Sequence, residues 1–149
     1  MNQFRHALLG ASIASVLGLG AYGMTAMAAN PTAMTARLAG SSEVPAVATE
    51  ANGTVDASLD SDSQVLTWKI TYSGLSGAAT AAHFHGPAMT GHSAGVVVPI
   101  PGSLASPITG SATLTPSQAA DLIAGKWYVN LHTAANPNGE VRGQVSVRP

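Results

Sequence analysis

The chain contains no cysteine, and charged side chains make up only 9% of its residues. Without thiols the protein can form neither disulfides nor thiolate metal sites, so any bound metal must be held by nitrogen or oxygen atoms. Six basic residues against seven acidic ones leave a formal net charge of −1. This balance argues against a nucleic-acid partner, because phosphate binding needs a basic patch.

Long apolar runs are also lacking, apart from a short one near the start of the chain. Arg5 precedes the apolar run 7–21, and the tripeptide 26–28 has the small outer residues that signal peptidase reads. The run is shorter than the roughly 20 residues of a membrane span. We therefore expect a cleaved signal peptide at 1–28, a periplasmic or secreted domain at 29–149, and no membrane span after cleavage. A retained anchor is the alternative.

The remainder of the chain has the pattern of a β protein. Short segments rich in Val, Thr, Ile, Tyr and Trp alternate with clusters of Gly, Pro, Asn and Ser. Leu66, Trp68 and Ile70 alternate with polar residues, as in a strand with one buried face. The strands predicted in this way are 34–38, 53–59, 64–72, 80–85, 95–100, 108–114, 126–132 and 140–147.

One segment, 116–124, interrupts the β pattern. Thr115 can cap a helix, Pro116 suits the first helical position, and Gly125 suits the position after the last. We predict an all-β fold, a Greek-key sandwich or barrel of the immunoglobulin-like or a related type, with one short helix near 116–124.

Four of the five histidines follow the expected cleavage site: His83, His85, His92 and His132. The period of a strand places His83 and His85 on one face, which makes them a preformed pair of nitrogen ligands. His132 ends another predicted strand on its polar side, and His92 lies in the glycine-rich loop between them. The four imidazoles suit copper, and zinc less well, because copper has the higher intrinsic affinity for such ligands. The alternative is that these histidines only make hydrogen bonds.

Several other side chains have two interpretations. The segment 136–139, Asn-Pro-Asn-Gly, predicts a turn between two antiparallel strands. Glu140 and Arg142 follow on one face, where they either form an ion pair or leave Arg142 free to attract a small anion near a metal. We interpret Met34 and Met89, whose thioethers could assist Cu(I), as loop residues.

The motifs together resemble the CHRD domain, a module named from chordin and also found alone in bacterial exported proteins. The resemblance covers nearly the whole of 29–149 but implies little about mechanism. It rests on residues 38–45 (LAGSSEVP), 72–75 (YSGL), 83–88 (HFHGPA), 128–133 (YVNLHT) and 139–144 (GEVRGQ).

A looser similarity connects the chain with Cu/Zn superoxide dismutase. It implies a superoxide-dismutase-like sandwich in which His83, His85 and His132 are copper ligands and His92 stands at the bridging position. Arg142 matches the arginine that guides the anion. The remaining zinc ligands and the disulfide cysteines of that enzyme are missing here.

Three functions follow as hypotheses. The first is a copper-binding domain for metal buffering or delivery, with His83, His85 and His132 as ligands and His92 as a fourth ligand or gate. The second is a copper-only, superoxide-dismutase-like enzyme that uses Arg142. The third is a metal-free extracellular binding or adhesion module. No feature of the sequence identifies a protein partner.

Overall fold

The computed structural model describes residues 31–149, so the expected signal peptide at 1–28 lies outside the described residues. The predicted domain, 29–149, is described from its third residue onward. Within this part of the chain, no helix has both the length and the apolar character that crossing a membrane requires.

Strands make up most of the described structure. In chain order they are β1 (Thr32–Ala39), β2 (Asn52–Asp60), β3 (Val65–Ser73), β4 (Ala79–His85), β5 (Val96–Pro99), β6 (Ile108–Thr113), β7 (Tyr128–Thr133), β8 (Val141–Gln144) and β9 (Ser146–Val147). Each predicted strand is present. The last one, 140–147, is divided into β8 and β9 at Val145, whose buried N–H donates to the carbonyl of Trp127.

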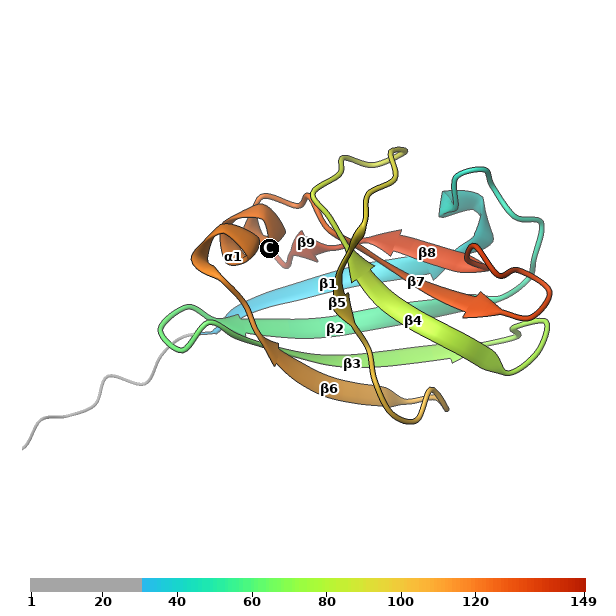
Figure 1. Ribbon diagram of the computed structural model, residues 1–149, viewed down its shortest axis with the longest axis horizontal. Helices are drawn as coiled ribbons and strands as arrows, with labels where there is room; N and C mark the ends of the chain where they lie inside the picture. The colour runs from blue at the N-terminus through green and yellow to red at the C-terminus, as the bar shows by residue number, and fades with distance from the viewer. Residues whose placement is uncertain (1–30) are drawn as a thin grey trace, which may run out of the picture.

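The strands form one antiparallel sheet in the order β5-β4-β7-β8-β1-β2-β3-β6, with β9 also paired to β1. The sheet curls into a nearly closed barrel, in which β4 crosses over β2 and β3 (Figure 1). Neighbouring strands are often distant in sequence: β4 lies between β5 and β7, and β6 returns beside β3. The all-β barrel expected from the sequence is confirmed.

Aromatic side chains fill the centre of the barrel. Trp68 of β3, Phe84 of β4 and Trp127 are buried, and the Phe84 ring centroid lies 5.2 Å from that of Trp68 and 6.1 Å from that of Trp127. Because successive side chains of a strand alternate between its faces, an inward Phe84 turns both of its neighbours, His83 and His85, outward.

The one α-helix of the described residues is α1 (Pro116–Ile123), as predicted. The Thr115 hydroxyl accepts from the N–H of Gln118, and the Gln118 side chain accepts from the N–H of Thr115, which forms a capping box. Gly125 follows the helix with a φ of 71°, a left-handed conformation that glycine adopts without strain. Leu122 turns its side chain into the core.

The position of Met34 differs from our interpretation of it as a loop residue. It lies in β1 with no exposed surface, so its assignment to a loop is wrong. Met34, Ala36 and Leu38 alternate along β1 and all point into the barrel. Met89 does lie in a loop and is 62% exposed.

Candidate metal centre

Polar side chains form rows across the outer face of β4, β7 and β8. In one row, Asn130 of β7 stands between His83 of β4 and Arg142 of β8; in the next, His85 faces Tyr128. This outer face is covered, since His85, Asn130 and Arg142 each have less than a tenth of their surface exposed. The barrel therefore has a second, polar layer outside its apolar core.

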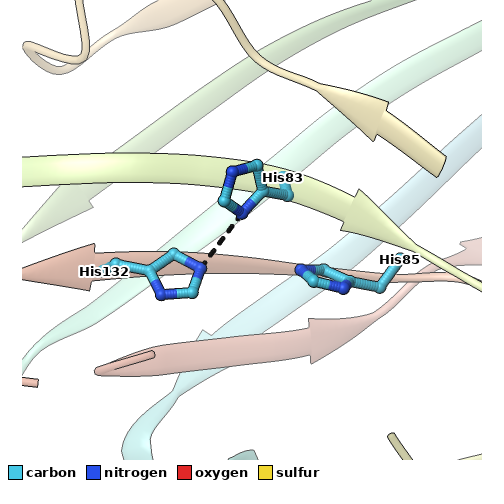
Figure 2. A group of neighbouring side chains, drawn as sticks. All are labelled: His83, His85 and His132. Atoms are coloured by element: carbon cyan, nitrogen blue, oxygen red, sulfur yellow. Dashed lines mark hydrogen bonds between the residues drawn. The ribbon is translucent and has the colours of Figure 1, made fainter. Parts of the chain in front are cut away.

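Three of the four predicted ligands converge in this layer. One ring nitrogen each from His83, His85 and His132 lies within 4.8 Å of the other two. Nδ1 of His83 is 3.1 Å from Nε2 of His132, and the other nitrogen of His83 points away from both neighbouring rings (Figure 2). The pairing of β4 with β7 creates this group, because it sets Ala81 and His83 opposite His132 and Asn130.

Backbone carbonyls determine which nitrogens of His85 and His132 carry a proton. Nδ1–H of His85 donates to the carbonyl of Ala94 at 3.0 Å, and Nδ1–H of His132 donates to that of Pro137 at 2.9 Å. A carbonyl can only accept, so both Nδ1 atoms are protonated and both Nε2 atoms of the neutral rings present lone pairs. Histidine ligands of metals are commonly held in this way, with the second ring nitrogen donating to a carbonyl or carboxylate.

Asn130 is a central residue that the sequence reasoning did not select. Its Oδ1 lies 3.0 Å from Nε2 of His85 and 3.0 Å from Nε2 of His132. Strand alternation places Asn130 on the same face as His132, and this is the signal in the sequence that could have identified it. Its contact with His85 depends on the pairing of two strands that are separated by about 40 residues in the chain.

Two of the three histidines, His83 and His85, have lowered pKa values, which favours the neutral form that metal binding requires. Burial lowers the pKa of His83, and the nearby His132 and His85 lower it further. Burial also lowers the pKa of His85, although the backbone of Ala94 and the side chain of Asn130 oppose this shift. Protons therefore compete less with a metal for these two rings than for an exposed histidine.

His92, the fourth predicted ligand, is not part of this group. Its side chain is exposed in the loop between β4 and β5, while its backbone carbonyl accepts a hydrogen bond from Arg142. The same loop contributes Ala94, whose carbonyl accepts from both His85 and the Tyr128 hydroxyl. The loop thus orients His85 through its backbone.

Arg142, the predicted anion guide, is buried and interacts with Tyr128 and with the carbonyl of His92. Only 3% of its surface is exposed, and its guanidinium carbon lies 3.4 Å from the centre of the Tyr128 ring. The His85 ring stacks on Tyr128 at 4.8 Å with an interplanar angle of 1°. Because β4 and β8 flank β7 on opposite sides, His85 and Arg142 enclose the tyrosine between them.

The ion pair considered between Glu140 and Arg142 is not formed. Glu140, with no exposed surface, accepts hydrogen bonds from Thr49, from Thr133, and from both the backbone N–H and the hydroxyl of Ser76. Burial alone would raise the pKa of Glu140, but these bonds outweigh it and lower the pKa to about 2. Neutral donors, not the arginine, therefore satisfy this carboxylate.

Glu43 is a second buried carboxyl, close to Asn130 and Arg142. Burial raises its pKa to about 7, although the charge of Arg142 and the side chain of Asn130 act in the opposite direction. Its Oε1 has no hydrogen-bond partner among the described residues. A β-carbon on Gly139 would collide with both Glu43 Oε1 and Asn130 Nδ2, so a glycine is needed where these two side chains meet.

The family of the chain is shown by comparison with known domains. The CHRD domain matches residues 34–145, which is most of the chain. The chain belongs to the CHRD-domain family. The matched segment of this CHRD domain includes all three converging histidines as well as Glu43, Asn130 and Arg142. Searches of curated proteins and of solved structures give no match.

Proposed function

We propose that this CHRD-domain protein is exported and binds copper through His83, His85 and His132, to buffer the metal or deliver it to another protein. The observation that carries the proposal is the convergence of three imidazole nitrogens within 4.8 Å of one another. Ligand atoms about 2.0 Å from one ion can be at most about 4 Å apart, so small rotations of the rings suffice to bind it.

The protonation of the rings supports the same proposal. Nδ1 of His85 and of His132 already donates to a carbonyl, which leaves the Nε2 lone pairs directed at the middle of the group. An arrangement meant only for hydrogen bonding would place a donor against both lone pairs, whereas here only Nε2 of His132 faces one, the N–H that Nδ1 of His83 can supply. Here the atom next to both of them is Asn130 Oδ1, another acceptor.

Copper is favoured over zinc by the ligand set and by the expected compartment. Nitrogen ligands without thiolates suit Cu(II), which lies above zinc in the affinity order for such sites. CHRD domains occur in extracellular proteins, which agrees with the signal peptide predicted at 1–28. In a periplasm or outside the cell, reduced cytosolic thiols would not compete for the metal.

Binding is a better proposal for this site than superoxide dismutation. A guiding arginine must present its charge to an incoming anion, whereas Arg142 is stacked on Tyr128 and donates to the carbonyl of His92. The metal-free module remains the alternative from a different class, and the first experiment separates it from the copper proposal.

The test is a calorimetric titration of Cu(II) into protein purified after expression of the full chain. We expect one ion per chain for the wild type and loss of this binding in a His83→Ala/His85→Ala double variant. His92→Ala is the matched control, because it removes an exposed imidazole outside the group. Equal, weak binding by the wild type and the double variant would favour the metal-free module.

A further inference from the structure

Asn130 Oδ1 is a fourth possible ligand atom among the nitrogens of the histidine group. Asn130 Oδ1 lies 3.0 Å from Nε2 of His85 and 3.0 Å from Nε2 of His132. Nε2 of His132 in turn lies 3.1 Å from Nδ1 of His83. The four atoms thus form a chain of three edges, each close to 3 Å, that begins at His85 and ends at His83.

These edges have the length expected around a square-planar ion. With metal–ligand bonds of about 2.05 Å, adjacent ligand atoms are about 2.9 Å apart in a square and about 3.3 Å apart in a tetrahedron. The two edges that include Asn130 Oδ1, at 3.0 Å, are closer to the square, and the third, at 3.1 Å, lies midway between the two values. Square-planar or tetragonal coordination by nitrogen and oxygen is typical of Cu(II), whereas zinc prefers the tetrahedron.

The acceptor atoms of the histidine group also favour a bound cation. His83 can donate to Nε2 of His132, but no proton is available between Asn130 Oδ1 and Nε2 of His85, because the proton of that ring is on Nδ1. Two acceptors 3.0 Å apart repel each other. A metal ion between them would convert this repulsion into two bonds.

Glu43 explains why the amide oxygen faces the histidines. Nδ2 of Asn130 and Oε1 of Glu43 both adjoin Gly139, and the side chain of Asn130 lowers the pKa of Glu43. Turning the amide over would place Oδ1 beside Glu43 Oε1, and above the raised pKa of about 7 the ionised carboxylate would then face a second acceptor. Glu43 is therefore a positioning residue for Asn130.

We propose that Asn130 Oδ1 is the fourth ligand, so that the site is a tetragonal centre of three nitrogens and one oxygen selective for Cu(II). This inference rests on the proposed copper function. It replaces His92, the fourth ligand suggested by the sequence, with a residue that already stands in place.

The first test uses wild-type protein alone. Protein grown with 15N-labelled asparagine and loaded with one Cu(II) is studied by pulsed electron paramagnetic resonance. We expect couplings from three imidazoles and one from the labelled amide. Four imidazoles, or three without an asparagine coupling, would overturn the proposal.

The second test compares variants. We expect Asn130→Leu, of similar volume, to weaken Cu(II) binding by about 10- to 100-fold and to change the spectrum, while Zn(II) affinity changes less. His92→Ala should leave both unchanged. Wild-type affinity and spectrum in folded Asn130→Leu would overturn the fourth ligand but leave the three-histidine proposal intact. Failure of the wild type to bind Cu(II) would instead overturn the proposed function itself.

Discussion

Glu43 and Glu140 are two buried glutamates of the same domain with opposite properties. Glu140 accepts four hydrogen bonds, and its pKa is lowered to about 2. Glu43 has a carboxylate oxygen without a partner, and its pKa is raised to about 7. Burial raises both pKa values, so the number of donors decides the sign of the net shift.

The difference separates a carboxylate that connects several elements of the fold from one that lies next to the proposed metal site. Glu140 joins the loop before β2, the β3–β4 loop and the end of β7 through Thr49, Ser76 and Thr133. Glu43 has no such set of donors, and its Oε1 adjoins Gly139 together with Nδ2 of Asn130. A buried polar group with few hydrogen bonds costs stability, and such groups are typical of functional sites.

The largest expected effect follows from removing the well-satisfied carboxylate. Glu140→Ala leaves the donors of Thr49, Ser76 and Thr133 without their acceptor in a buried place. We expect the free energy of unfolding at pH 7 to fall by about 4 kcal/mol in chemical denaturation. Glu50→Ala, at an exposed glutamate, is the control and should change it by less than about 0.5 kcal/mol. A similar small loss for Glu140→Ala would contradict its structural role.

Acid should remove most of the same stabilisation in the unmodified protein. The folded-state pKa of Glu140 is lowered from 4.5 to about 2, so its contribution is complete above pH 4.5 and disappears as the pH falls towards 2. The shift corresponds to about 3 kcal/mol. Denaturation curves measured from pH 6 to pH 2 should show this decline, and Glu140→Gln should flatten it.

Glu43 should respond in the opposite sense. Because its folded-state pKa is raised from 4.5 to about 7, ionisation destabilises the fold as the pH rises through this window. We expect Glu43→Gln to increase the free energy of unfolding by about 3 kcal/mol at pH 8 and to leave it nearly unchanged at pH 4. An equal effect at both pH values would show that charge is not the cause.

The smallest effect concerns Arg142, which lowers the pKa of Glu43 and packs on Tyr128. Arg142→Met keeps much of the side-chain volume but removes the charge, so we expect a further rise in the pKa of Glu43, measured by carboxyl NMR. The loss of the cation–π contact should lower the free energy of unfolding by about 1 kcal/mol. The pKa of Glu140 should not change, since Arg142 does not contribute to it.

Much of the fold was predictable because its signals are local. The alternation of Leu66, Trp68 and Ile70 follows from the geometry of one strand, and the cap at Thr115 involves residues three positions apart. Met34 was misjudged although its own strand, 34–38, was predicted correctly.

The site was predictable only in part, because most of its contacts join residues that are distant in the chain. Strand geometry requires that His83 and His85 share a face. It cannot indicate that Glu140 accepts hydrogen bonds from Ser76 instead of pairing with Arg142, because Ser76 is 64 residues away in the chain. The partners of Glu43 and Asn130 likewise come from separate loops and strands.

The amino-acid sequence by itself determined the thiol-free composition, the strands and their inward and outward faces, and the short helix, since each depends on neighbours along the chain. Only the tertiary structure decided that β4 pairs with β7, that three histidines meet around Asn130, and that one of two buried glutamates lacks donors. Such contacts depend on which distant strands pack together, and strand order is selected by burial of the whole core.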